Sequence, residues 1–153
     1  MNSKKFLYIL FFLLFFDALV IFNEEISLGI VLGEPNGLSL KLQKNKNFIL
    51  DTGIGFNTKE NYFLFCLDFL RYDYGKIKSK EITGKIPVFY GLGMKMENTK
   101  KDTLFGIRFV CGVEYIFEDI PFNIFVKIVP TLNLVPETSA YIYPSIGIRY
   151  ILK

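Results

Sequence analysis

Histidine and tryptophan are absent from this 153-residue chain, and cysteine occurs only twice. Without histidine, the Ser-His-Asp and Cys-His arrangements of nucleophilic catalysis and every imidazole metal site are excluded. A formal charge of +3 is far from the strongly basic character of a nucleic-acid-binding domain. We therefore expect no nucleic-acid partner, no cofactor and no metal site, and we predict that the protein is not an enzyme.

The N-terminal segment has the pattern of an export signal. Lys4 and Lys5 precede an apolar run over Phe6–Phe16, which matches the charged and hydrophobic regions of a secretory signal peptide. Cleavage near residue 18 and cleavage near residue 23 both fit the sequence. The alternative is a retained membrane helix. The apolar stretch is interrupted by Asp17, however, and is short for a helix that must cross about 30 Å of hydrocarbon. We predict a signal peptide over residues 1–23 and one domain over residues 24–153.

After residue 25 the chain alternates apolar with polar residues or glycine, which is the pattern of β-strands rather than helices. The connections between the alternating segments are mostly short and rich in Pro, Gly, Asn and Asp, which favours antiparallel neighbours. We predict an all-β fold, an eight-stranded antiparallel up-and-down β-barrel. The predicted strands span Ile26–Gly33, Leu38–Gln43, Phe48–Phe56, Tyr62–Tyr72, Pro87–Glu97, Leu104–Ile116, Phe122–Leu134 and Ile142–Leu152.

The two faces of the predicted strands differ in chemistry. One face is almost wholly apolar, with Arg71 as its one charge, and the other carries the remaining strand charges together with most of the glycines. Because an unpaired buried charge is costly, we expect most charges of the second face to form ion pairs, with a net charge near +1. This predicted network comprises Lys41, Asp51, Asp68, Lys95, Glu97, Arg108, Glu114, Lys127 and Arg149.

The alternation has two interpretations. In a soluble barrel or sandwich the apolar face is the core and the charged face meets water. Glycine weakens strands, and on a solvated face the space that it leaves has no use. In the narrow interior of a membrane barrel, the same space can accommodate large side chains. With 17% aromatic residues and a mean hydropathy of +0.33, we favour a transmembrane barrel whose apolar side chains contact lipid.

Cysteines and aromatic residues give further expectations. Cys66 and Cys111 fall on opposite faces of strands that are not neighbours, which predicts two free thiols rather than a disulfide. Aromatic residues near strand ends are candidates for the interfacial girdles of a membrane barrel, with ordinary packing as the alternative. These candidates are Tyr62, Tyr72, Tyr90, Tyr115, Phe117, Phe122, Tyr143 and Tyr150.

Several motifs resemble those of small outer-membrane barrels of bacteria. They are the Gly-x-Gly pairs at Gly53–Gly55 and Gly91–Gly93, the related segments Gly106–Phe109 and Gly147–Tyr150, and the stretches Gly33–Ser39, Val113–Pro121 and Leu134–Glu137. The last three resemble a spirochaete-type family of OmpA/OmpX-like size. The resemblance implies an integral outer-membrane protein in contact with outer-membrane lipid and, for some members, binding of host extracellular components through loops.

Two features depart from that pattern. The chain printed here closes with Tyr150–Lys153 rather than with an aromatic residue, which outer-membrane barrels commonly have at this point. The longest connection, Tyr74–Ile86, would lie on the periplasmic side together with the termini, although long loops are usually external. This connection is rich in lysine, so it either contacts lipid phosphates or an acidic glycan, or is simply solvated.

Three functions are consistent with the sequence. The leading hypothesis is an integral outer-membrane barrel with a structural or surface-interaction role, including binding of host components. The alternatives are a narrow ion or small-solute channel and a soluble lipocalin-like carrier of apolar ligands. Asp51 and Asp68 could form an acid/base pair, but the nearby cations favour structural ion pairs.

Overall fold

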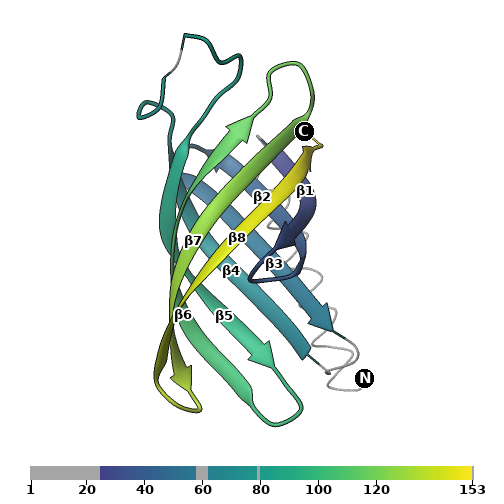
Figure 1. The fold of residues 1–153 in the computed structure, drawn as a ribbon, viewed down its shortest axis with the longest axis vertical. Coiled ribbons are helices and arrows are strands. Elements are labelled where there is room, and N and C mark those ends of the chain that lie inside the picture. Colours follow the sequence, from purple (N-terminus) through teal and green to yellow (C-terminus); the bar gives the residue numbers. More distant parts are fainter. Residues whose placement is uncertain (1–24, 58–61, 79, 153) are drawn as a thin grey trace.

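The computed structural model describes residues 25–57, 62–78 and 80–152, which form one closed barrel of eight antiparallel strands (Figure 1). Each strand pairs with its neighbours in the chain, and β1 pairs with β8 to close the barrel. The signal segment predicted over residues 1–23 lies outside the described residues. The strands are β1 (Glu25–Leu32), β2 (Gly37–Asn45), β3 (Phe48–Asn57), β4 (Tyr62–Asp73), β5 (Val88–Asn98), β6 (Thr103–Ile116), β7 (Phe122–Val135) and β8 (Ser139–Ile151).

The prediction of an eight-stranded antiparallel up-and-down barrel is therefore confirmed, and most strand limits differ by only one or two residues. The largest difference is at β8, which begins at Ser139 rather than at Ile142. Ser139 pairs with Asn133 and Ile142 with Pro130, so backbone pairing with β7 extends the strand through residues that resemble a loop in sequence. Pairing with the adjacent strand here overrides local composition.

Because successive residues of each strand point to opposite sides of the wall, the barrel has an apolar outer surface and a charged inner surface. Large apolar side chains from every strand are exposed on the outside, for example Ile30 on β1, Leu92 on β5 and Ile146 on β8, with 50–60% of their surface accessible. The strand charges of the opposite register are buried inside. Leu42 is an exception, because it has the outward register but is buried.

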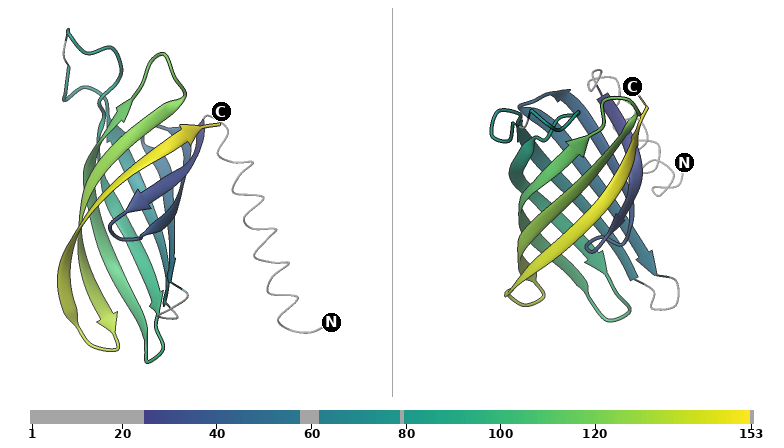
Figure 2. Two further views of the ribbon diagram at one scale, coloured as in Figure 1. Left: turned by 45° about the vertical axis from the view of Figure 1, so that its right-hand side comes forward. Right: turned by 45° about the horizontal axis from the view of Figure 1, so that its top comes forward.

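The barrel has two unlike ends. We call one the terminal end: there β1 begins, β8 ends, and the connections 46–47, 74–87 and 117–121 lie (Figure 1). The opposite end, which we call the turn end, carries the connections 33–36, 99–102 and 136–138. The strands tilt around the barrel, and the β1–β2 hairpin stops short of the level that β5 to β8 reach (Figure 2). The wall is therefore lower at β1 and β2 than elsewhere.

Candidate functional site

A network of buried ion pairs fills the middle of the barrel. Asp51 lies 2.7 Å from Arg149 Nη2 through Oδ1 and 3.0 Å from Lys127 Nζ through Oδ2. Asp68 lies 3.1 Å from Arg108 Nε and 3.7 Å from Lys127 Nζ. All five side chains are buried and come from five different strands. The network therefore ties together parts of the wall that are not paired through their backbones.

The network continues toward the terminal end. Glu114 lies 3.3 Å from Arg149 Nη1 and 3.1 Å from Lys41 Nζ, and Lys41 lies 2.7 Å from Glu25. The Nε of Arg149 also donates a hydrogen bond of 2.9 Å to the hydroxyl of Ser39. Arg149 thus joins two carboxylates and a hydroxyl, which makes it the most connected cation of the interior.

A second group of charges lies toward the turn end. The Nζ of Lys95 lies 2.9 Å from Glu34 Oε1 and 3.1 Å from Glu97 Oε2. The same ammonium is 4.9 Å from the centre of the Tyr143 ring, within the range of a cation–π interaction. Lys95 is almost fully buried, so the two carboxylates supply the charge compensation that water would otherwise give.

Glu34 reaches the interior because the β1–β2 turn bends inward. Gly33 has a φ of 121°, a left-handed conformation that glycine adopts without steric cost. The backbone N–H of Glu34 donates to the hydroxyl of Ser145, which donates in turn to the carbonyl of Glu34, both at 3.1 Å. Pro35 occupies the space beside Gly53, where a Cβ would lie 2.6 Å from the proline ring. The turn therefore caps the barrel near its low wall.

All nine residues of the predicted network lie inside the barrel wall, and each takes part in at least one ion pair. Sequence reasoning missed two participants, Glu25 and Glu34, so the described network has five cations and six carboxylates instead of the expected excess of one cation. Glu25 could have been found, because it shares the inward register of Ser27. Nothing in the strand pattern marks Glu34, which lies in a turn.

The interior also contains an apolar cluster that the two-face pattern did not predict. Tyr72 stacks on Phe89 with ring centres 5.2 Å apart, and the guanidinium of Arg149 lies 3.8 Å from the centre of the Phe125 ring. The girdle position predicted for Tyr72 is therefore wrong, because its register on β4 is that of the buried Leu70. The cluster comprises Val31, Ile49, Leu70, Tyr72, Phe89, Val110, Phe125 and Val129.

Glycines make room for this cluster. A Cβ at Gly147 would lie within 2.5 Å of the Phe125 ring, and a Cβ at Gly112 would lie 2.5 Å from the Phe89 ring. The crowding inferred from the sequence is present, but these two glycines accommodate phenyl rings rather than the long cations for which the room was expected. The rings in turn support the cations, since Arg149 packs on Phe125.

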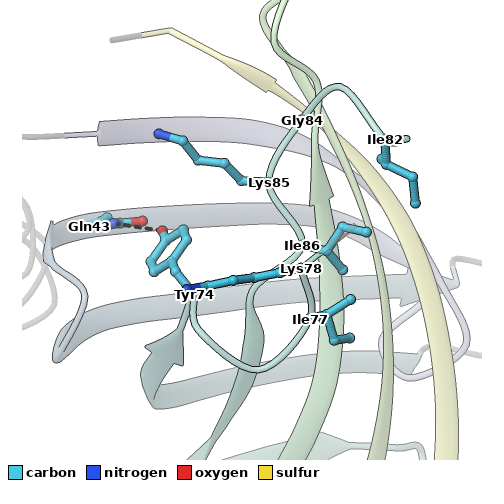
Figure 3. A pocket seen from close by; sticks show the side chains of 8 residues that line it. All are labelled: Gln43, Tyr74, Ile77, Lys78, Ile82, Gly84, Lys85 and Ile86. Atoms are coloured by element: carbon cyan, nitrogen blue, oxygen red, sulfur yellow. Dashed lines mark hydrogen bonds between the residues drawn. The ribbon is translucent and has the colours of Figure 1, made fainter. Parts of the chain in front are cut away.

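The longest connection, residues 74–87, covers a pocket of about 510 Å³ at the terminal end (Figure 3). The phenol of Tyr74 accepts a hydrogen bond of 3.4 Å from the side-chain amide of Gln43, and partial burial raises the pKa of this phenol. The pocket combines isoleucine side chains with two lysines. Its lining is Gln43, Tyr74, Ile77, Lys78, Ile82, Gly84, Lys85 and Ile86.

Asp51 and Asp68 are register partners on β3 and β4, and each is held by two cations, which is the arrangement of structural ion pairs. Within residues 25–57, 62–78 and 80–152, no group of three or more acidic or cysteine side chains is placed to hold a metal ion. No helix in the same ranges is long and apolar enough to cross a membrane.

The two cysteines lie on opposite surfaces of the wall, as the register predicts, and both are free thiols. Cys66 is buried inside, where Arg108 Nη1 donates to its Sγ. Cys111 faces outward and contacts the carbonyl of Ile128 at 3.6 Å. The buried thiol is therefore part of the interior packing around Arg108.

Comparison with known proteins gives no match: no protein-family profile, no curated protein and no solved structure is similar to this chain at a significant level.

Proposed function

We propose that the protein is an integral outer-membrane β-barrel with a structural or surface-interaction role that involves no enzymatic turnover. The observation that carries this proposal is the outer surface, where exposed apolar side chains surround the barrel on all eight strands. The strand charges are gathered inside, in ion pairs. The exceptions in the outward register lie near strand ends, and they are Lys44 on β2 and Arg71 and Asp73 on β4.

Water is a poor solvent for such a surface. Soluble monomers rarely expose contiguous apolar patches larger than a few hundred Å². Burying apolar surface is worth about 25 cal/mol per Å², so hydrocarbon around the barrel would stabilise it strongly. Closure by β1 and β8 also meets the requirement that a sheet in lipid leave no unpaired edge.

Strand lengths agree with this proposal. A tilted strand needs about 9–11 residues to cross a bilayer. Strands β2 to β8 have 9 to 14 residues, and β1 has 8. The export signal expected over residues 1–23 is in keeping with an outer-membrane location, and the surrounding lipid would be the principal partner.

A soluble carrier of apolar ligands is the less favoured alternative. A lipocalin-like protein directs its apolar residues inward to line a ligand cavity. Here residues such as Leu92 and Ile146 point outward, while Lys41, Arg108 and Arg149 fill the interior. The ion pairs and the inserted β1–β2 turn also argue against a diffusive channel, because they occupy the path that a solute would take.

The surface-interaction role has a geometric limit. If the terminal end faces the periplasm, the turn end faces the outside of the cell, and the connections of the turn end are short. Binding of host components would then use these turns and the adjoining rim of β5 to β8 rather than long loops. We therefore place the structural role first and the interaction role second.

Phase partitioning tests the membrane assignment. The membrane-extracted protein should enter the detergent phase and show heat-modifiable mobility on a gel, because closed barrels resist detergent until they are heated. A variant with Lys101→Gln in the turn end is the control and should behave identically. A protein that stays monodisperse in detergent-free buffer and partitions into water would overturn the proposal and support the carrier alternative.

A further inference from the structure

The outer surface carries an exposed arginine, Arg71, near the end of β4. Its neighbours on that surface are Phe69 and Asp73, one alternation away on either side along the same strand, and Tyr90, its register partner on β5. The carboxylate of Asp73 accepts a hydrogen bond of 2.9 Å from the backbone N–H of Gly75. Arg71 makes no ion pair with any residue in the described part of the chain. A charge on this largely apolar surface without an ion-pair partner among the described residues points to a partner outside the chain.

A second cation lies over the ring of Tyr90, the register partner of Arg71. The ammonium of Lys76, from the connection 74–87, is 6.0 Å from the centre of the Tyr90 ring. Arg71 and Lys76 therefore flank the same aromatic side chain, one from the strand and one from the loop. Both are exposed at the terminal end, where a membrane surface would meet the barrel if the proposed function holds.

An apolar groove lined by Arg71 and Tyr90 runs along the outer wall. It has a volume of about 450 Å³ and crosses from the start of β3 to β6. Phe69 and Leu92 are register partners, as are Leu92 and Phe109, so three neighbouring strands supply its floor. The groove is lined by Asn47, Phe48, Ile49, Phe69, Leu70, Arg71, Tyr90, Gly91, Leu92 and Phe109.

We propose that this groove, headed by Arg71 and Lys76, is a binding site for an anionic glycerophospholipid of the surrounding membrane. The guanidinium of Arg71 would hold the phosphate with two parallel hydrogen bonds, and Lys76 would supply a second positive charge. An acyl chain would lie along Phe69, Leu92 and Phe109. The proposal rests on the membrane-embedded barrel proposed above, and charge complementarity selects an anionic over a zwitterionic lipid.

The absence of tryptophan from the chain permits a direct test. Tyr90→Trp places a single fluorophore in the groove and keeps an aromatic ring under Lys76. Tyr150→Trp is the matched reporter: Tyr150 is exposed on the outer surface of β8, near the same end of the barrel but on strands that do not form the groove. Each variant is reconstituted into vesicles that contain brominated lipids, which quench tryptophan on contact.

Brominated phosphatidylcholine tests the membrane assignment by itself. Both reporters should be quenched to a similar extent if the outer wall contacts lipid. Quenching of neither reporter would overturn the proposed function, and the lipid site with it.

Brominated phosphatidylglycerol, as a minor component of phosphatidylcholine vesicles, tests the site. It should quench the Tyr90→Trp variant more than the Tyr150→Trp variant, with about a fivefold enrichment for each cation at the site. Adding Arg71→Gln or Lys76→Gln to the Tyr90→Trp variant should reduce the enrichment by about that factor, whereas adding Lys101→Gln at the turn end should leave it unchanged. Equal quenching of the two reporters would overturn the lipid site and leave the membrane assignment intact.

Inorganic phosphate separates a lipid site from a simple anion site. Because the groove contributes contacts to the acyl chain, added phosphate should displace little of the brominated phosphatidylglycerol at constant ionic strength. Complete displacement would show that the two cations bind free phosphate and that the groove plays no part, which would overturn the proposal.

Discussion

The inner and outer surfaces of this barrel are built from alternate residues of the same strands, yet they tolerate opposite chemistry. Inside, Arg149 contacts two carboxylates, a hydroxyl and a phenyl ring. Outside, Arg71 has no ion pair with a described residue. The environment of a charge, rather than its residue type, therefore sets its energetic role.

The largest effect is expected from Arg149→Leu. The substitution removes one cationic partner from each of the buried carboxylates Asp51 and Glu114. This should lower the free energy of unfolding by about 3–5 kcal/mol. The same change on the outer surface, Arg71→Leu, should have almost no effect in zwitterionic vesicles. Urea unfolding of the vesicle-embedded barrel measures both, and equal losses would contradict the distinction between the two surfaces.

The reverse change, adding a charge outside, should also be costly. Ile128 is exposed near the middle of β7, and Ile128→Lys should destabilise a membrane-embedded barrel by about 2–4 kcal/mol. Tyr150→Lys, near the end of β8, should cost only about 0–1 kcal/mol because the lysine reaches the interface. The measurement is again the urea midpoint in vesicles. A neutral effect of Ile128→Lys would argue that this surface meets water.

Overpacking of the interior should have an intermediate effect. In Gly147→Ala the added methyl group meets the Phe125 ring, which supports Arg149, and we expect a loss of about 1–3 kcal/mol. The control is Gly75→Ala in the connection after β4, where the nearest atom is Asp73 Oδ1 at 3.4 Å. That control should change stability by less than about 0.5 kcal/mol. Comparable losses in the two variants would show that Phe125 can move aside.

The smallest effect is expected at the inserted turn. Glu34→Gln leaves Lys95 paired with Glu97, so the loss of stability should be about 1 kcal/mol. Because the central ion pairs stay in place, planar-bilayer recordings of both the parent protein and this variant should show no discrete current steps. Current steps in the parent protein would favour the channel alternative. Current steps in the variant alone would show that the β1–β2 turn is the element that blocks conduction through the barrel.

Much of this structure could be predicted because strand alternation is local. Residues two apart share a face of a strand, so Lys127 and Phe125 could be assigned inward and Val126 outward from the sequence. The same rule assigns Tyr62, Tyr72 and Tyr143 to the inner register, where aromatic content alone suggested a girdle. Those three misplaced candidates show that register is a better guide than residue type.

The ion-pair partners could not be predicted in this way. Asp51 on β3 contacts Lys127 on β7, across the barrel rather than along the sheet. Which side chains meet there depends on closure, strand tilt and stagger, which are properties of the whole barrel. The place of Glu34 depends further on a turn that bends inward at Gly33, a choice that its short polar sequence does not reveal.

Alternation with a period of two residues acts within each strand, so the amino-acid sequence is enough to define the eight strands and the two surfaces. Which charges meet, how Phe125 and Phe89 fill the centre, and how the β1–β2 turn caps the low wall depend on the folded barrel. These contacts join residues distant in the chain, and their geometry exists only once β1 and β8 have closed the sheet.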